Sequence, residues 1–162
     1  MIRFELIDVS FKLRHKNAIK NWIKEIISGK NHRVGDINYI FASDEYVLGV
    51  NREYLGHDYY TDIITFDTSQ YSDEVAGRRP SGRISADIVI SLDTVLANGV
   101  EYGAGFSTEL YRVMAHGVLH LLGYDDLSPE EAKLMRRAED CALGLLPGFG
   151  ILPDQAYIQK QI

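Results

Sequence analysis

The sequence predicts an α+β fold, in which a sheet of about four strands is covered by about five helices. Short segments that alternate apolar and polar residues, or that run apolar with β-branched residues, are typical of strands. Longer segments with apolar residues three and four apart are typical of helices. These segments follow one another in the order β-α-β-α-β-β-α-α-α, so strands dominate early in the chain and helices late. Such a segregated order favours α+β over a regular βα alternation.

The first third of the chain predicts two strands and two helices. Ile2 to Ile7 alternates apolar and charged residues, which indicates a strand. About Lys16 to Ser28 carries one apolar helical face. A second strand is expected over Ile37 to Ala42, after a Gly-Asp turn. Ser43 then has the side chain of an N-cap, which begins a short helix.

The middle of the chain predicts a long hairpin followed by a helix. The strands are Asp62 to Phe66 and Arg83 to Ser91, and the polar segment Gln70 to Gly82 joins them. Ser91 is a second N-cap residue. The helix after it should run from Leu92 to about Asn98, where an Asn-Gly pair is expected to break it.

Two further helices complete the prediction. Glu109 to Leu122 is apolar on most sides, so it belongs inside the core. Ser128 and Pro129 begin the last helix as N-cap and first helical residue, and Gly144 ends it. The single cysteine, Cys141, is expected as a small core residue. One domain should therefore span residues 1–146, with a C-terminal tail over 147–162.

The central helix carries one polar stripe with metal-ligand spacing. Glu109, Arg112, His116 and His120 share a face about 80° wide at ~100° per residue. Histidines four residues apart stack on adjacent turns and can hold one ion. Gly123 ends the helix, and Asp126 follows after a turn that can return it to the same ion, giving H-x-x-x-H-x-x-G-x-x-D. The simpler interpretation is two satisfied core histidines, but the full pattern favours a metal.

The donor set predicts Zn²⁺ in a catalytic site. Two imidazoles and one carboxylate leave a tetrahedral ion one open position for water, whose pKa can fall to about 7. A metallopeptidase of the H-E-x-x-H type needs a glutamate directly after the first histidine, and Gly117 stands there instead. A phosphodiester substrate, and RNA in particular, can assist through its own oxygens and its 2′-hydroxyl.

These residues resemble a known family. HGVLHLLGYDD is similar to the H-G-x-L-H-L-x-G-Y-D-H motif of the bacterial YbeY family of rRNA maturation factors. NREYLGHDYYTDIITF resembles that family's N-x-x-Y-R and T-D-V-L-S-F block, SADIVIS its G-D-I-V-I strand, and residues 130–144 its closing helix. The resemblance covers roughly residues 35 to 145.

The resemblance implies a zinc-dependent, single-strand-specific endoribonuclease of the cytoplasm, acting in 16S rRNA processing and ribosome quality control. It implies a mixed sheet, one zinc per chain at the mouth of a cleft, and His116, His120 and Asp126 as ligands. The implied partners are single-stranded rRNA precursors and small ribosomal subunit proteins. The family has His where this chain has Asp126, and Asp125 is an alternative third ligand.

A second departure concerns an arginine. The family has Arg where this chain has Leu55, and Arg52 or Arg112 can take over its charge. Further cations lie in and beside the hairpin loop, either as solvated charges or as mobile phosphate contacts. The candidate substrate-binding residues are Arg52, Arg78, Arg79, Arg83 and Arg112.

The segment between the short helix and the hairpin holds further polar residues. His57 and Asp58 can be interpreted as additional ligands, but exposed loop residues are the better interpretation. Thr61 and Asp62 match the family's T-D pair, so a supporting role near the cleft is expected.

Charge and composition limit the function classes. The formal net charge of −6 argues against a general electrostatic hold on nucleic acid, but Arg14 to Arg33 forms a local basic segment. That segment is either a solvated helix face or a phosphate-contacting edge. No apolar run approaches the ~18 residues of a membrane span. One cysteine suits a reducing cytoplasm.

Three functions are therefore compared. The first is the metal-dependent endoribonuclease, with metal-bound water as nucleophile. The second is a ribosome-assembly factor with a structural metal and little nuclease activity. The third is a metallopeptidase, which Gly117 disfavours.

Overall fold

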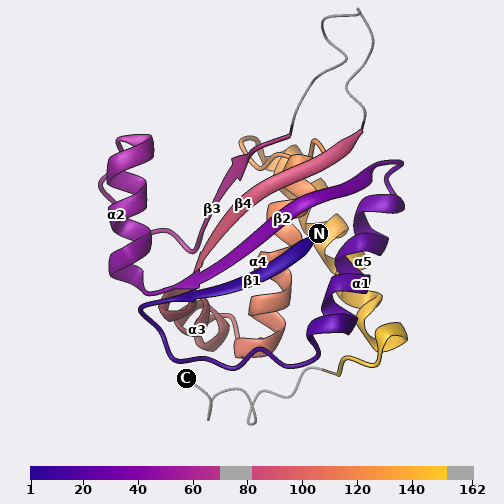
Figure 1. Cartoon of the computed structure of the whole chain (residues 1–162), viewed down its shortest axis with the longest axis horizontal. Coiled ribbons are helices and arrows are strands. Elements are labelled where there is room, and N and C mark those ends of the chain that lie inside the picture. Colours follow the sequence, from indigo (N-terminus) through magenta and orange to yellow (C-terminus); the bar gives the residue numbers. More distant parts are fainter. Residues whose placement is uncertain (70–81, 153–162) are drawn as a thin grey trace, which may run out of the picture.

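The computed structural model describes residues 1–69 and 82–152 and has the expected α+β architecture (Figure 1). Four strands form one sheet, and five α-helices and a 3₁₀ turn surround it in the described part of the chain. The elements are β1 (Ile2–Ile7), α1 (Lys16–Ser28), β2 (Arg33–Ala42), α2 (Asp44–Leu55), β3 (Ile63–Asp67), β4 (Arg83–Ser91), α3 (Leu92–Glu101), α4 (Phe106–Leu121), α5 (Pro129–Gly144) and η2 (Leu146–Phe149).

The sheet is mixed, as expected from the family resemblance. Its strand order is β1-β2-β4-β3. β1 and β4 both run parallel to β2, which lies between them. β3 forms the other edge and runs antiparallel to β4, with Ile63 opposite Ile90. The hairpin prediction is therefore confirmed for the two strands, whereas most of its loop, residues 70–81, lies outside the described residues.

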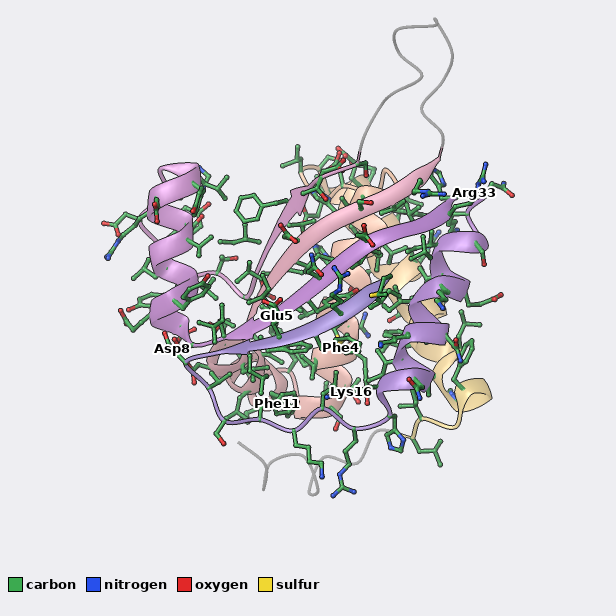
Figure 2. The ribbon with its side chains drawn as sticks, viewed as in Figure 1. Phe4, Glu5, Asp8, Phe11, Lys16 and Arg33 are labelled. Carbon is green, nitrogen blue, oxygen red and sulfur yellow. The ribbon has the colours of Figure 1, made fainter. Side chains whose placement is uncertain are left out.

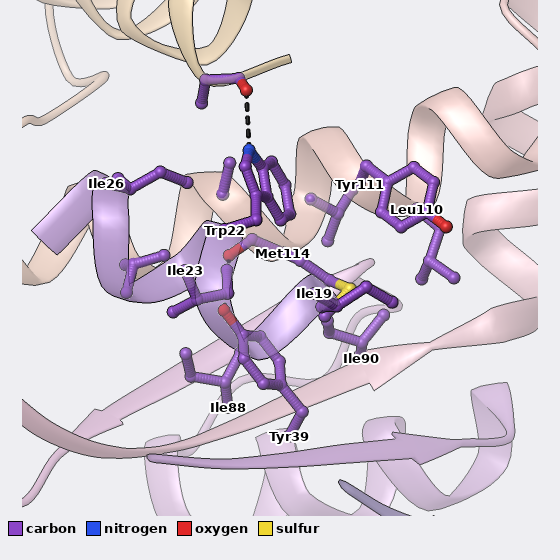
Figure 3. Close-up of a cluster of buried hydrophobic side chains, with 14 of the residues drawn as sticks. Ile19, Trp22, Ile23, Ile26, Tyr39, Ile88, Ile90, Leu110, Tyr111 and Met114 are labelled. Carbon is purple, nitrogen blue, oxygen red and sulfur yellow. Dashed lines mark hydrogen bonds between the residues drawn. The ribbon is translucent and has the colours of Figure 1, made fainter. Parts of the chain in front are cut away.

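The two faces of the sheet bury different side chains. The larger core joins β4 to α1 and α4 and includes Ile88, Trp22 and Met114 (Figure 3). A smaller cluster on the other face joins Val89 of β4 to Val47 of α2. Because neighbouring residues of a strand point to opposite faces, β4 supplies both cores. α4 is thus enclosed by the sheet and by other helices.

Two buried hydrogen bonds connect the layers. The indole Nε1 of Trp22 donates to the carbonyl of Ala142 over 2.7 Å and connects α1 to α5 (Figure 3). The hydroxyl of Tyr39, from β2, donates to the carbonyl of Met114 over 2.9 Å. Burial raises the pKa of Tyr39, which therefore stays a neutral donor.

The three predicted serine caps are confirmed. Ser43, Ser91 and Ser128 each accept a hydrogen bond from the backbone N–H three residues later, over 3.2, 3.1 and 3.1 Å. These bonds satisfy N–H groups that have no partner within the helix. They fix where α2, α3 and α5 begin.

Three local predictions are wrong. β2 begins at Arg33 rather than Ile37, because a register shift against β4 accommodates the Gly-Asp pair within the strand. α3 continues through Gly99 to Glu101. Cys141 is exposed on α5 rather than buried.

At Gly99, α3 lies against another turn of the chain. A Cβ at this position would lie 2.6 Å from the carbonyl oxygen of Gly105. Glycine here permits the close approach of two backbone segments.

The segment after α5 begins to pack against the core. Leu146 and Ile151 are each 1% exposed and belong to the larger core. Among the described residues, no helix is long and apolar enough to cross a membrane.

Candidate metal centre

α4 places the two histidines of the polar stripe side by side. The rings of His116 and His120 are nearly parallel, with centroids 6.2 Å apart and planes 11° apart. The helix ends at Leu121, and Gly123 adopts a φ of 106°, which an L side chain rarely tolerates. The resulting turn brings the Asp-Asp pair back toward the helix.

His116 is held from behind by α5. Its Nδ1 lies 2.7 Å from Oε2 of Glu139, and its Nε2 lies 3.7 Å from Oδ2 of Asp126. The hydrogen bond that His116 donates to Glu139 raises the pKa of His116 more than partial burial lowers it. The carboxylate therefore fixes the ring orientation and leaves Nε2 facing Asp126.

His120 is held by the turn that follows its own helix. Its Nδ1 lies 2.8 Å from the backbone carbonyl oxygen of Tyr124 and 3.4 Å from Oδ1 of Asp125. Asp125 is thus beside the nitrogen that already has a backbone partner. Asp126, in contrast, is beside the Nε2 of the neighbouring histidine.

Glu139 connects the histidine to a buried arginine. Its side chain is 7% exposed, and its Oε1 accepts a 3.1 Å hydrogen bond from Arg112. Arg112 also donates to Asp140 over 2.8 Å. This arrangement satisfies both oxygens of a buried carboxylate, because each has a nitrogen partner.

Asp62 lies close enough to act electrostatically on His116. Burial raises the pKa of this carboxyl group, and the charge of His116 opposes that rise. The aspartate of the Thr61-Asp62 pair thus lies near His116, just before β3.

Gly117 faces the sheet. A Cβ at this position would lie 3.1 Å from Cδ1 of Ile63 and 3.2 Å from the methyl carbons of Ile88. The helix therefore packs tightly on β3 and β4 at the point where it presents its histidines.

The candidate substrate-binding arginines do not gather at one place. Arg112 is 13% exposed and engaged by α5, and Arg52 pairs with Asp58 on the surface. Arg83 begins β4, opposite Arg33. Arg78 and Arg79 lie outside the described residues. Leu55, which replaces the family arginine, is exposed at the end of α2.

The alternative ligands after α2 are engaged elsewhere. The ring of His57 stacks on Tyr59 with centroids 5.2 Å apart, and its Nδ1 lies 3.0 Å from the Tyr59 hydroxyl. Asp58 is the partner of Arg52. Both are exposed loop residues, the preferred interpretation.

Within residues 1–69 and 82–152, no three His, Cys, Asp or Glu side chains are already grouped tightly enough to hold a metal ion. The orientation of the two histidines and the donor chemistry of the three side chains nevertheless suit a metal ion. Both histidines have Nδ1 occupied by a hydrogen-bond acceptor, the usual arrangement for histidines that bind a metal through Nε2. Two ligands of tetrahedral zinc lie about 3.3 Å apart, given bonds of ~2.0–2.1 Å. The 3.7 Å between His116 and Asp126 is close to that separation.

Sequence reasoning missed the two groups that orient the histidines. One is a backbone carbonyl, that of Tyr124, and the sequence carries no signal for it. The other, Glu139, did leave a signal. It shares the buried side of α5 with Met135 and Ala142, where a carboxylate needs a partner.

Comparisons with known proteins give one consistent result. A family model described as Endoribonuclease YbeY matches residues 5–146. A protein of Bacteroides thetaiotaomicron with that name is 46% identical over 130 residues, covering 80% of this chain and 88% of its own. A protein of the same name from Phocaeicola vulgatus is 44% identical over 146 residues, covering 90% and 99%.

A solved structure supports the fold. The solution structure of TM1509 from Thermotoga maritima superposes with a TM-score of 0.57 at 24% identity, covering 91% of this chain and 90% of that one. At this identity the likeness concerns the fold alone.

Proposed function

This chain belongs to the YbeY endoribonuclease family, and from that membership we propose that it is a zinc-dependent hydrolase that cuts single-stranded RNA in 16S rRNA maturation and ribosome quality control. One observation carries the metal assignment. Two stacked imidazoles are each fixed through Nδ1, and a carboxylate lies beside the free Nε2 of His116.

His116, His120 and Asp126 are the proposed ligands of one zinc ion. Asp126 is favoured over Asp125 because Asp125 lies beside the nitrogen of His120 that Tyr124 already engages. A carboxylate is a harder ligand than the family's histidine, so the metal preference should shift toward harder ions. Bound zinc would supply a water of lowered pKa as the nucleophile.

The surrounding residues orient the site. Glu139 and the Tyr124 carbonyl accept the Nδ1 protons, which holds each imidazole in the tautomer with a free Nε2. Asp62 adds negative charge near His116 and so favours a cation there. No carboxylate follows the first histidine, so proton transfer must involve the substrate's own oxygens or a second group.

The proposed partners are single-stranded rRNA precursors and small-subunit proteins in the cytoplasm.

The second candidate function is that of a ribosome-assembly factor with a structural metal and little nuclease activity. Leu55 favours it, because the family's arginine is missing from this position. The metallopeptidase is disfavoured, because Gly117 packs against the sheet.

The experiment that tests this proposal is elemental analysis of the purified chain and of His120→Ala, with no metal added. We expect about one zinc per chain in the wild type, lost in the variant. Asp126→Ala should also lose most of the zinc, whereas Asp125→Ala should keep it. Cleavage of a single-stranded RNA should follow the zinc content and stop with chelator. No zinc in the wild type would leave the two histidines without a metal role and favour a binding or assembly factor that lacks the metal.

A further inference from the structure

A hollow is lined by residues of α1, α4 and α5. Its volume is about 340 Å³, and its floor is largely apolar. The floor is formed by Ile26 of α1, Leu119 of α4, and Leu134, Ala138 and Ala142 of α5. The indole bond from Trp22 to the Ala142 carbonyl holds the two helices together beneath it. Neither of the two histidines lines this hollow.

A second hollow continues the first toward the candidate metal centre. It measures about 420 Å³ and is lined by Gly123 and Asp125. Both hollows share Lys30, Tyr124 and Leu134, so they form one groove. At the shared corner, the backbone carbonyl of Tyr124 is the group that engages His120. The groove therefore begins beside a proposed ligand and ends between α1 and α5.

Two cations stand at the groove without an ion-pair partner. Lys30 and Arg137 are exposed, and no carboxylate in the described part of the chain lies within ion-pair distance of either. Lys30 Nζ sits 5.3 Å from the centre of the Tyr124 ring. Glu25, Asp125 and Glu131 also line the groove, so its charge is mixed rather than uniformly basic.

An apolar floor with cations at its rim matches a ligand that combines a flat apolar face with a phosphate. An unpaired nucleotide has this combination, because its base is not covered by a partner strand. Bases in a duplex are stacked and cannot enter such a hollow. An acidic peptide offers the charge but lacks the ring.

We propose that single-stranded RNA runs from the metal centre past Tyr124 and places one unpaired base in the groove between α1 and α5, with its phosphates at Lys30 and Arg137. This inference rests on the proposed function and extends it. It assigns the preference for single strands to a specific hollow. It also gives the end of the basic segment, near Lys30, a role as a phosphate-contacting edge.

The single cysteine gives a direct probe of occupancy. Cys141 is exposed and lines the groove. The experiment measures the rate of Cys141 alkylation at increasing concentrations of a single-stranded RNA with 2′-O-methyl groups, which removes the assistance of the 2′-hydroxyl to cleavage. The alkylation rate should fall in proportion to the fraction of protein bound. A duplex of the same sequence should leave the rate unchanged.

Charge reversal tests the two cations, with binding measured by fluorescence anisotropy of the same oligonucleotide. Lys30→Glu and Arg137→Glu should each weaken binding about tenfold and lower the salt dependence. Lys16→Glu is the matched control, because it makes the same charge change at the opposite end of α1 (Figure 2). It should weaken binding less than about twofold. Thermal unfolding checks that all three variants are folded.

The outcomes separate this inference from the proposed function. If RNA is bound and cleaved but Cys141 stays fully reactive and Lys30→Glu behaves like Lys16→Glu, the groove is the wrong site while the nuclease stands. If the wild type neither binds nor cleaves RNA, both fail. If a glutamate-rich peptide protects Cys141 as well as RNA does, the groove is a general polyanion or acidic-peptide site and the nucleotide assignment is rejected.

Discussion

Glu139 illustrates how one side chain can orient a histidine without itself binding a metal. Its two oxygens are divided between His116 and Arg112 at 2.7 and 3.1 Å, and the side chain is almost fully buried. Such a carboxylate needs both partners, because an unpaired buried charge is costly. Arg112 therefore has a structural role here, whatever its role toward RNA.

Replacing Glu139 by Gln should weaken zinc binding by about 10- to 100-fold, because a neutral amide holds the histidine less firmly and makes it less basic. Competition with a chromogenic chelator measures this affinity without any turnover. The control is Asp140→Asn, which also removes a carboxylate beside Arg112 but does not touch His116. Its zinc affinity should stay close to that of the wild type. Equal losses in the two variants would contradict the positioning role.

Glu109 is a second buried acid on α4, with a different consequence. Burial raises its pKa above the ordinary value of 4.5, while Arg112 opposes the rise. The folded chain therefore holds the Glu109 proton to a higher pH than the unfolded chain does, so stability falls as pH rises through that window.

Glu109→Gln should therefore stabilise the metal-free protein by about 1 kcal/mol at pH 7, because it removes a poorly solvated charge. The gain should shrink toward zero as the pH is lowered below 4.5. Urea unfolding followed by circular dichroism over this range measures it. A gain that is the same at every pH would mean that the charge of Glu109 is not the cause.

At the scale of single elements, two helical glycines allow a matched comparison. Gly99 of α3 lies against the Gly105 turn, whereas Gly49 of α2 has no atom within 4 Å of its would-be Cβ, apart from its own helix and chain neighbours. Both residues are in the interior of a helix. Close packing thus requires glycine at position 99 but not at position 49.

Gly99→Ala should lower the free energy of unfolding by about 1–3 kcal/mol, because its methyl group meets backbone that cannot turn away. Gly49→Ala should raise it by roughly 0.4–1 kcal/mol, through lower entropy of the unfolded chain. Thermal unfolding of both variants and the wild type measures these two changes in stability. Stabilisation by Gly99→Ala would show that α3 is free to move away from the turn.

The elements also show which predictions sequence can support. The limits of α1 and the caps at Ser43, Ser91 and Ser128 depend on neighbours within one turn, so local patterns suffice. The Asn-Gly pair was wrongly expected to end α3 at Asn98, because the contact that requires glycine at position 99 is with Gly105, six residues later. The histidine pair was visible from spacing, but its orienting groups come from another helix and from a backbone carbonyl. Those contacts arise only when the chain is folded.

Over the whole molecule, strand order was beyond sequence reasoning, because periodicity shows which face is apolar and not which strand is the neighbour. The packing of the segment after residue 146 could not be predicted from the sequence either. Residues 147–162 were predicted as a C-terminal tail beyond the domain, and Ile151 within that tail belongs to the larger core. The described part of this segment therefore contributes to stability.

Ile151→Ala should lower the free energy of unfolding by about 2–4 kcal/mol, because it leaves a cavity in the core. The adjacent Leu152 is 75% exposed, and Leu152→Ala should change the free energy by less than about 0.5 kcal/mol. Chemical denaturation of both variants gives the comparison. Equal effects would indicate that the segment does not stay packed in solution.

The close contact between Gly117 and the sheet bears on how this scaffold can change during evolution. A glutamate at this position would be the single substitution that converts the helix pattern to H-E-x-x-H. Its side chain would begin inside the van der Waals contact of Ile63 and Ile88, so the helix would have to lift off two strands first. Peptidase chemistry is therefore not one mutation away from this protein, even though the two sequence patterns differ at one residue.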